Sequence, residues 1–358
     1  MSEDLAKKRR LLTGDTPTGA LHLGHYVGTL ENRLRLQDDY DCYFVLANKH
    51  SFTTQAEDPA RIRENVLAVA TDWLAVGIDP HKSALFIQSE VPEIDELTFY
   101  FAMLLPFNRV MRNPTLKEEI ITKKLGDSYS FGFPLYAVGQ TADILAFRPD
   151  LIPVGKDQLP HIEMTREVAR RFNALYLGIA ESGEEQETKA LGGFFGEVKP
   201  LLGRVERLVG TGGPNADGQL LKMSKSLNNA ILLSDDADTV RDKVMAMYTD
   251  PTRLRASDPG HVENNPLWIF HDTFNKDTAW VADNKARYEV GGIGDVAIKK
   301  NLIDVLNAFL DPIRTRRDSF AKHPEDVLSI LRTGTEKARH ITAETMSLVK
   351  KAIRQDYW

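Results

Sequence analysis

The sequence predicts an α/β fold in which a doubly wound parallel sheet is followed by an α-helical domain. From Leu11 to about Val209, short apolar runs alternate with amphipathic stretches, and this alternation is typical of a parallel sheet with helices on both faces. Beyond Asp235 the strand signals nearly vanish and long amphipathic helical patterns follow one another. We therefore expect an α/β domain over residues 1–234 and a helical domain over residues 235–358.

The individual elements follow from apolar periodicity and from turn residues. The first strand is expected at 11–12, and a glycine-rich turn leads from it into a helix within 13–28, TGDTPTGALHLGHYVG. Asp58 should cap a further helix, which Gly77 ends. The other expected strands are 42–47, 84–88, 151–154 and 204–209, the other expected helices are 93–112, 136–147, 157–173, 236–248, 264–275, 299–317, 324–333 and 335–354, and loops are expected at 181–202 and 210–218.

The composition is that of a globular chain, with 358 residues of which 42% are hydrophobic and 27% charged. One cysteine excludes a disulfide framework and any cysteine-based metal site, and its apolar context, CYFVLA, predicts that Cys42 is a buried, inert thiol. The N-terminal MSEDLAKKRR is too charged for a signal peptide, and an apolar run of membrane-spanning length is missing. We therefore expect a cytoplasmic protein without a membrane partner. A net charge of −6 still allows a nucleic-acid partner, because phosphate contacts need only a local basic patch.

His22 and His25 lie where the glycine-rich turn gives way to the first helix. Free backbone N–H groups and the helix dipole favour anions at that position, and two imidazoles beside it could donate to phosphate oxygens as charge builds in a transition state. A helix cap, a packed core residue or a metal pair are the alternatives, although a third His or Cys ligand is lacking nearby. A P-loop is absent, and GTGGPNADG at 210–218 is followed by no helical pattern. The turn is therefore the expected nucleotide site.

A second motif, KMSKS at 222–226, stands further along the chain. HLGH and KMSKS together resemble the two signature sequences of class I aminoacyl-tRNA synthetases, in the expected order and separation. Within that class the chain is most similar to the tryptophanyl-tRNA synthetase family. The segments that carry this resemblance are GDTPTGALHLGHYVGTL, SEVPE at 89–93, RNPTLKEE at 112–119, TADILAFRPDLIPVGKDQLPHIEMTREVARRFN at 141–173 and MYTDPTRLRASDPG at 247–260.

The resemblance implies a Rossmann-type catalytic domain and a helical domain that reads the anticodon. It implies activation of L-tryptophan by ATP, with release of pyrophosphate, and then transfer of tryptophan to the 3′ end of tRNA(Trp). Mg²⁺ is expected to arrive with ATP, with no protein-bound structural metal, and the family works as a homodimer. The implied catalytic residues, which serve the phosphates, are His22, His25, Lys222 and Lys225.

The same resemblance implies which residues contact ATP. Gly24 lacks a side chain, which allows the nucleotide to approach the backbone closely. The sequence departs from many members of the family at Thr16, where they carry glutamine or arginine, and this puts the contact between the turn and the KMSKS loop in doubt. The implied nucleotide contacts are Thr16, Pro17, Thr18, Gly24, His25, Gly155, Lys156, Asp157, Val205, Lys222, Met223, Ser224, Lys225 and Ser226.

Asp143 is the candidate for recognition of the amino acid. An indole N–H is only a donor, so a tryptophan pocket needs an acceptor. An Asp is seldom fully buried without a partner, so its place within an apolar helix favours a functional interpretation. A helix cap or an ion pair with Arg148 is the alternative. By resemblance, the other residues that line the pocket or hold the polar end of the amino acid are His50, Tyr136, Gln140 and Gln158.

Other interpretations remain open at this stage. A tyrosyl-tRNA synthetase shares the fold and the chemistry with a different pocket, a silent paralogue would bind tRNA or protein without catalysis, and a nucleotidylyltransferase shares the histidine tetrad. Basic clusters in the helical domain are either solvated helix faces, the interpretation favoured for any one cluster, or a surface that faces tRNA. These clusters are Arg314, Arg316 and Arg317; Lys337 and Arg339; and Lys350, Lys351 and Arg354.

Overall fold

A five-stranded parallel sheet forms the centre of the molecule in a computed structural model, which describes residues 8–126, 128–180, 192–205 and 207–358. The strand order is β3-β2-β1-β4-β5, and every neighbouring pair is parallel. The strand order reverses beside β1, and a crevice outside the carboxyl ends of the strands forms at such a point. The strands are β1 (Arg10–Asp15), β2 (Asp41–Leu46), β3 (Ser83–Ile87), β4 (Leu151–Val154) and β5 (Lys199–Leu202).

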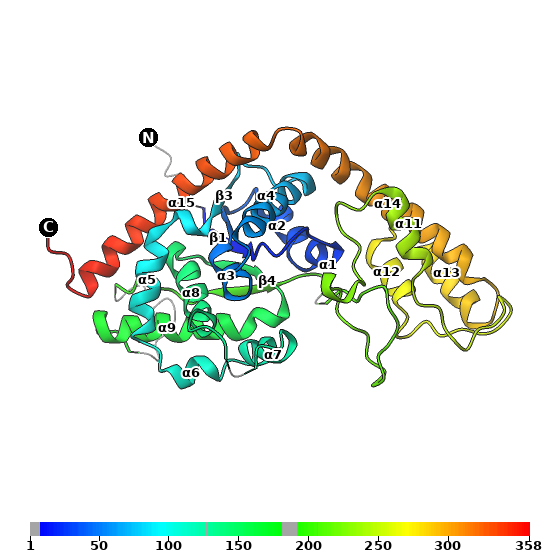
Figure 1. Ribbon diagram of the computed structural model, residues 1–358, viewed down its shortest axis with the longest axis horizontal. Coiled ribbons are helices and arrows are strands. Elements are labelled where there is room, and N and C mark those ends of the chain that lie inside the picture. Colours follow the sequence, from blue (N-terminus) through cyan, green and yellow to red (C-terminus); the bar gives the residue numbers. More distant parts are fainter. Residues whose placement is uncertain (1–7, 127, 181–191, 206) are drawn as a thin grey trace, which may run out of the picture.

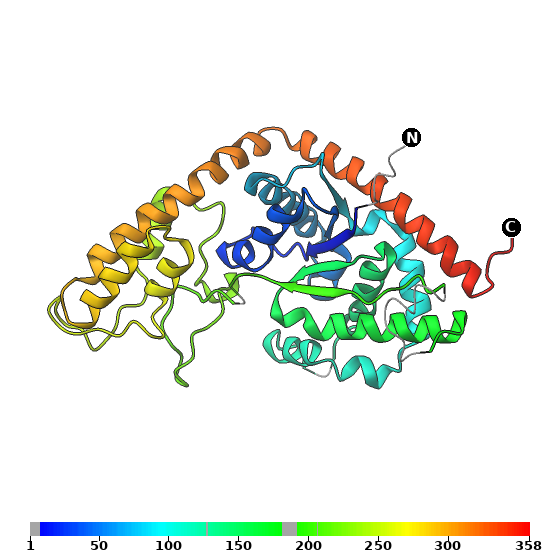
Figure 2. The same ribbon diagram turned by 180° about the vertical axis from the view of Figure 1, so that it is seen from behind.

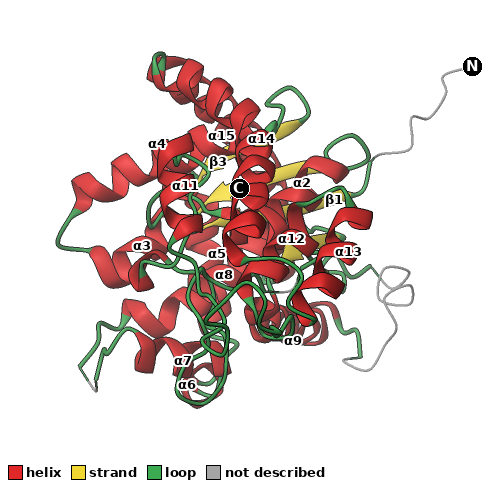
Figure 3. Ribbon diagram, turned by 90° about the vertical axis from the view of Figure 1, so that its right-hand side faces the viewer, coloured by secondary structure: helices red, strands yellow, loops and turns green. Residues whose placement is uncertain are grey.

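Helices cover both faces of the sheet, so the predicted α/β class is confirmed (Figure 3). Successive side chains of a strand point to opposite faces, and accordingly Leu11 belongs to one apolar cluster and Leu12 to the other. The helices of this part are α1 (Leu23–His25), α2 (Glu31–Leu36), α3 (Asn48–Gln55), α4 (Pro59–Val76), α5 (Pro92–Ala102), α6 (Phe107–Met111), α7 (Pro114–Thr122), α8 (Gly132–Phe147) and α9 (Leu159–Leu177), and a π-helical turn, Tyr26–Leu30, joins α1 to α2.

The ends of α4 lie where the sequence predicts them. The Asp58 side chain accepts a hydrogen bond from the backbone N–H of Arg61 at 3.1 Å, which satisfies one of the free donors of the first turn. Pro59 follows at the first helical position, where its missing N–H costs nothing. Gly77 ends the helix in the left-handed conformation, with φ at 110°.

The chain from residue 237 onward is mainly helical, as predicted. Its elements are α11 (Ala237–Met245), α12 (Pro266–Phe274), α13 (Thr278–Glu289), α14 (Asp295–Ala321) and α15 (Pro324–Ala352). Figures 1 and 2 show α14 and α15 as an arc that leads from this helical region back over the sheet, where α15 packs on β3. In the described part of the chain, the helices are too short or too polar to span a bilayer.

The strand expected at 204–209 is wrong, because β5 lies earlier, at Lys199–Leu202, inside the segment expected to be a loop. A Cβ on Gly203 would come within 2.4 Å of the Gly28 carbonyl oxygen, so the chain crosses the backbone of the first helix closely there and leaves the sheet. Of the described residues in 204–209, only Val209 makes a strand-like bridge, to Lys222. Residues 181–191 of the expected loop lie outside the described residues.

The break expected between 324–333 and 335–354 is also wrong, because α15 runs through Gly334. A Cβ at this glycine would lie 2.0 Å from the carbonyl oxygen of Leu85. The glycine therefore permits contact between α15 and β3 rather than ending the helix. Three helices that the sequence does not predict, α3, α7 and α13, complete the fold.

Gly334→Ala is expected to lower the free energy of unfolding by about 3 kcal/mol, because the new methyl group must push α15 off β3. Gly28→Ala is the matched control, since nothing lies within 4 Å of a Cβ there. That substitution should stabilise the protein by up to about 1 kcal/mol through helix propensity. Urea unfolding of both variants measures the difference, and equal stabilities would show that the contact with β3 is looser than the structure indicates.

Candidate active site

His22 and His25 lie at the carboxyl end of β1, after the turn at Thr16–Gly19. His22 is extended, with φ −127° and ψ 170°, and α1 begins at the next residue. Its backbone N–H donates to Nδ1 of His25 at 3.1 Å, and the two rings are 3.8 Å apart between centroids. A Cβ at Gly24 would lie 2.9 Å from the His22 ring, so a glycine between the two histidines leaves room for this imidazole.

Both histidines are neutral at physiological pH. Burial lowers the pKa of His22 to about 2, and the nearby His25 and the two KMSKS lysines add to the effect. Burial also lowers the pKa of His25 to about 4, although the Asp15 carboxylate opposes the shift. Nδ1 of His22 is buried and has no hydrogen-bond partner among the described residues. The rings are therefore suited to act as uncharged hydrogen-bond donors.

NMR titration of the imidazole signals is expected to show no protonation of His22 or His25 between pH 8 and about 5.5, because their pKa values of about 2 and about 4 lie well below this range. The signals can be assigned by comparison with the His22→Gln variant. In urea-unfolded protein the same signals should titrate near pH 6.5, the value of an exposed histidine. A folded-state midpoint above pH 6 would contradict burial of the pair.

The segment that follows the KMSKS motif is hydrogen-bonded directly to the HLGH segment. The backbone N–H of Leu23 donates to the Ile231 carbonyl at 3.0 Å, and that of Leu233 donates to the Leu21 carbonyl at 2.9 Å. Asn229 closes the KMSKS turn: its Oδ1 accepts the Ser224 N–H at 2.7 Å, and its Nδ2 donates to the Lys222 carbonyl at 3.2 Å. The two motifs, far apart in the sequence, therefore form one unit at the end of β1.

The two lysines of the motif differ in their surroundings. Nζ of Lys225 donates to the Thr18 carbonyl at 3.1 Å, and burial lowers the pKa of this lysine while Asp72 and Asp15 oppose the shift. Nζ of Lys222 is more exposed and lies 3.9 Å from the Asp157 carboxylate. Lys225 is thus held over the turn, whereas Lys222 faces the loop that follows β4.

The remaining predicted nucleotide contacts lie on the turn after β1, on the loop after β4, after β5 and on the KMSKS turn. Thr16 and Thr18 are exposed on the turn, Pro17 is buried, and Met223 is buried beneath the KMSKS turn. Ser224 and Ser226 lie 2.9 Å apart between their hydroxyl oxygens. Residues 155–157 follow β4, and a Cβ at Gly155 would lie 2.7 Å from the Asp157 carboxylate. Val205, partly buried, packs against the core on the α4 side of the sheet.

Asp143 on α8 is the buried carboxylate of a second group of polar residues. Its carboxylate oxygens accept hydrogen bonds from Nε2 of Gln88 at 2.8 and 2.9 Å, and Nε2 of His50 lies 3.4 Å away. Burial raises the pKa of Asp143 to about 7, and the Gln88 hydrogen bond opposes the shift. The alternative pair with Arg148 is wrong, because Arg148 lies near Glu344 instead, at 3.5 Å.

Tyr136 lies between two histidines, with ring centroids 5.6 Å from His50 and 5.8 Å from His161. Its hydroxyl donates to Glu119 at 3.0 Å. Burial lowers the pKa of His50 to about 3 and that of His161 to about 4, so both rings are neutral. The structure therefore brings Asp143, His50 and Tyr136 together, as the sequence predicts.

Gln140 and Gln158 connect this polar group to the loop that follows β4. Nε2 of Gln140 donates to Oε1 of Gln158 at 2.9 Å, and Nε2 of Gln158 donates to Asp157 at 3.0 Å. Sequence reasoning missed Gln88, Glu119 and His161 as members of the group. Gln88 offered one usable signal, since it directly follows β3, and the carboxyl ends of parallel strands meet at one edge of the sheet.

Comparison with known proteins agrees with this arrangement. The sequence profile of the family "tRNA synthetases class I (W and Y)" matches residues 4–311. A tryptophan–tRNA ligase of Clostridium longisporum is 46% identical over 355 residues, which cover 98% of both chains. A tryptophan–tRNA ligase of Streptococcus pneumoniae is 46% identical over 352 residues, 97% of this chain and 98% of the relative.

Among solved structures, tryptophanyl-tRNA synthetase from Campylobacter jejuni, complexed with ADP and tryptophan, superimposes with a TM-score of 0.79 and 30% sequence identity, covering 96% of this chain and 99% of that one. A likeness of this extent includes both the sheet and the helical region. The chain therefore belongs to the class I tRNA synthetases, and within them to the family of tryptophan–tRNA ligases.

Proposed function

We propose that this protein activates L-tryptophan with ATP and transfers the tryptophanyl group to tRNA(Trp). The observation that carries the proposal is the combination of the joined HLGH and KMSKS motifs with a buried carboxylate, Asp143, that pairs with Gln88 at the end of β3 of the same sheet. Relatives that are 46% identical over almost the whole chain are tryptophan–tRNA ligases, and the related C. jejuni enzyme binds ADP and tryptophan. Fold, motifs and relatives thus support one reaction.

In the first step, the tryptophan carboxylate attacks the α-phosphorus of ATP, which forms tryptophanyl-adenylate and releases pyrophosphate. The protein contributes position and charge stabilisation rather than covalent chemistry. His22 and His25 donate neutral hydrogen bonds to the α-phosphate. Lys222 and Lys225 neutralise the departing pyrophosphate. In the second step, the hydroxyl of the terminal adenosine of tRNA attacks the adenylate and accepts the tryptophanyl group.

ATP occupies the crevice between the turn after β1, the loop after β4 and the KMSKS turn. Mg²⁺ enters with ATP and is held mainly by phosphate and water oxygens, and the described residues contain no cluster of three or more His, Cys, Asp or Glu suited to a metal. The residues assigned to the nucleotide are Thr16, Pro17, Thr18, Gly24, His25, Gly155, Lys156, Asp157, Val205, Lys222, Met223, Ser224, Lys225 and Ser226.

The tryptophan side chain lies against α8. Its indole N–H is only a donor and needs an acceptor, which the Asp143 carboxylate supplies. Tyr136 and His50 line the ring, and the linked amides of Gln140 and Gln158 face the polar end of the amino acid. Gln88 is added to this set, because its amide fixes both oxygens of Asp143.

The helical region from residue 235 binds the anticodon, and residues 1–234 carry out the chemistry. A homodimer is the working form, and its interface includes Phe99 on α5, Met103 at the carboxyl end of α5 and Phe107 on α6, which are each more than half exposed. Exposed apolar side chains that lie close together mark protein interfaces. Sedimentation velocity of Met103→Asp should show a shift toward monomer relative to the unsubstituted protein.

ATP–pyrophosphate exchange with each of the twenty amino acids, without tRNA, tests the reaction. Exchange that depends on tryptophan alone would support both the chemistry and the pocket. Exchange with tyrosine would retain the chemistry and refute the assignment of the pocket. Silence with all twenty amino acids would refute the proposal and favour a paralogue without catalytic activity, for which binding to tRNA would be measured next.

A further inference from the structure

The arginines near the end of α14 do not form a solvated helix face. Arg314 donates to the carbonyl of Asp235 at 3.1 Å, Arg316 donates to the carbonyl of Ala75 on α4, and Arg317 donates from Nε to Oδ1 of Asp72 at 2.7 Å. The solvated interpretation is therefore wrong for this cluster. Its guanidinium groups join the helical region to the catalytic part.

Asp72 connects Arg317 to the residue that precedes the HLGH motif. Its side chain is fully buried, and its second oxygen, Oδ2, accepts the backbone N–H of Leu21 at 2.8 Å. Leu21 directly precedes His22. Burial raises the pKa of Asp72, while the Leu21 hydrogen bond and Arg317 favour the charged form. One carboxylate thus accepts a hydrogen bond from each of two segments, one on each of its oxygens.

Arg314 makes a parallel connection to the KMSKS segment. Oδ2 of Asp235 accepts the backbone N–H of Leu232 at 2.8 Å, and Leu232 forms an antiparallel bridge with His22. Arg314 donates to the backbone carbonyl of the same Asp235. Two arginines one turn apart on α14 are therefore connected, through Asp72 and Asp235, to the two backbone segments that hold His22.

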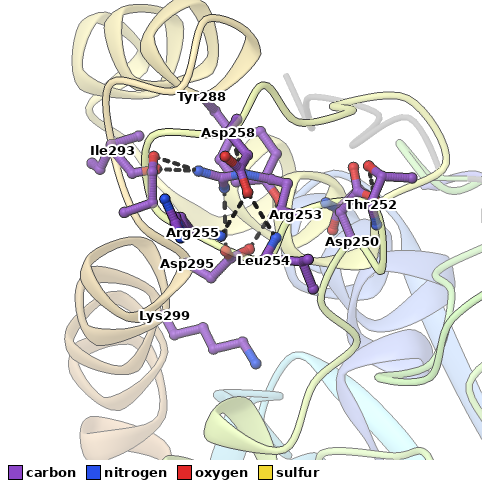
Figure 4. Close-up of polar contacts among 12 residues, drawn as sticks. Asp250, Thr252, Arg253, Leu254, Arg255, Asp258, Tyr288, Ile293, Asp295 and Lys299 are labelled. Carbon is purple, nitrogen blue, oxygen red and sulfur yellow. Dashed lines mark hydrogen bonds and ion pairs between the residues drawn. The ribbon is translucent and has the colours of Figure 1, made fainter.

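The other end of α14 is anchored within the helical region. Arg253, whose side chain is almost fully buried, donates to Asp295 at 3.2 Å and to the Ile293 carbonyl at 2.7 Å, and its guanidinium lies 3.9 Å from the centre of the Tyr288 ring (Figure 4). Lys299, one turn further along, donates to the carbonyls of Met245 and Met247. These contacts hold the start of α14 within the helical region, and the helix continues through Pro312 to the turns that carry Arg314 and Arg317.

We propose that Asp72 and Arg317 are positioning residues for amino-acid activation, and that they set the backbone of Leu21 and His22 according to the placement of α14. The inference rests on the proposed function. In the transition state His22 must hold the α-phosphate, and a small displacement of its backbone misaligns the donor. The amino-acid pocket, built from α3 and α8, does not depend on this connection.

The test compares Arg317→Ala with Arg316→Ala in tryptophan-dependent pyrophosphate exchange. Arg316 is the matched control, because it joins the same helix α14 to the same helix α4 but does not contact Asp72. Rates are divided by the concentration of active sites, and thermal unfolding is recorded for every variant. We expect kcat to fall about 10- to 100-fold in Arg317→Ala, with KM for tryptophan unchanged, and to stay within about twofold of the unsubstituted enzyme in Arg316→Ala. Arg317→Lys, which retains one donor for Asp72, should recover most of the rate.

A double substitution separates positioning from general stability. In Asp72→Asn the side-chain oxygen can still accept from Leu21, but the amide then faces Arg317 donor to donor. Removing the guanidinium as well relieves this conflict, so Asp72→Asn/Arg317→Ala should be no slower than Asp72→Asn alone. A general loss of stability would instead multiply the two effects. If Asp72→Asn does not fold, the comparison of Arg317→Ala with Arg316→Ala still tests whether Arg317 has a positioning role.

Three results would overturn the inference while the unsubstituted enzyme remains active. These are an unchanged kcat in Arg317→Ala, an equal loss of kcat in Arg316→Ala, or a loss confined to KM for tryptophan. Failure of the proposed function is distinguishable, because the unsubstituted enzyme itself would then be silent with every amino acid, and this inference would fail with it. If tyrosine drives exchange, the same variants are compared with tyrosine.

Discussion

Asp143→Ala is expected to lower kcat/KM for tryptophan in pyrophosphate exchange by about 100-fold or more, while KM for ATP changes little. The indole N–H would lose its acceptor, and both hydrogen bonds that Gln88 donates to the carboxylate would be lost as well. The residues proposed to contact ATP lie on the turn after β1, on the loop after β4 and on the KMSKS segment, so these contacts should persist. Steady-state kinetics with tryptophan and ATP varied separately measure both effects.

Thr141→Ala is the matched control for this substitution. Thr141 is fully buried on the same helix, and its hydroxyl donates to the carbonyl of Ala137, within α8. Truncation there removes a buried polar group of similar size without touching the pocket, so kcat/KM for tryptophan should change by less than about threefold. Equal losses in both variants would attribute the effect of Asp143→Ala to disturbance of α8 rather than to recognition.

The ionisation of Asp143 provides a second test of its assignment to the tryptophan pocket, through the pH dependence of the reaction. Because burial raises this pKa to about 7, the carboxyl is largely protonated below pH 7 and becomes an acceptor-only carboxylate above it. The ratio kcat/KM for tryptophan reports ionisations of the free enzyme, and it should therefore rise with pH through about 7. Asp143→Asn cannot ionise and should lose this rise. A rise that persists in Asp143→Asn would assign the titration to another group.

The carboxyl ends of the strands were largely predictable from the sequence. Turn glycines, the apolar runs and the alternation of elements identify four of the five strands, because each of these signals is local. The motif residues then fall at strand ends, which in a parallel sheet lie at one edge. This explains why HLGH could be assigned to a nucleotide site from local signals, whereas the residues after β4 and Asp143 were assigned to the site through the family resemblance.

Contacts between distant segments were not predictable, because they depend on what the fold places opposite each residue. The pattern Arg314, Arg316 and Arg317 is typical of an exposed helix face, and nothing in the local sequence indicates that Asp72 lies against it. In the sequence, Gly334 resembles the end of a helix. Only the folded structure shows that β3 lies against this glycine. Likewise Gln88 and Asp143 are far apart in the chain, and their pairing exists only in the folded protein.

Lys225→Ala is expected to lower kcat for pyrophosphate exchange by about 100- to 1000-fold, a loss of about 3–4 kcal/mol of transition-state stabilisation. The structure holds this ammonium group over the turn after β1, through its hydrogen bond to the Thr18 carbonyl. Asp15 and Asp72 support its positive charge. A charge fixed in advance near the phosphates stabilises the departing pyrophosphate without reorganisation. KM for tryptophan should be unchanged, since the pocket on α8 has no contact with Lys225.

Two further substitutions separate the charge of Lys225 from its bulk. Lys225→Met retains the length of the side chain and loses the charge, so it should be as slow as Lys225→Ala. Lys225→Arg retains the charge, but its larger head group must fit beside Gly19, where even a Cβ would lie 3.1 Å from Nζ. We expect it to recover only part of the rate. A fast Lys225→Met would show that the side chain acts by packing the KMSKS turn, and the exposed Lys222 would then be the group that neutralises the pyrophosphate.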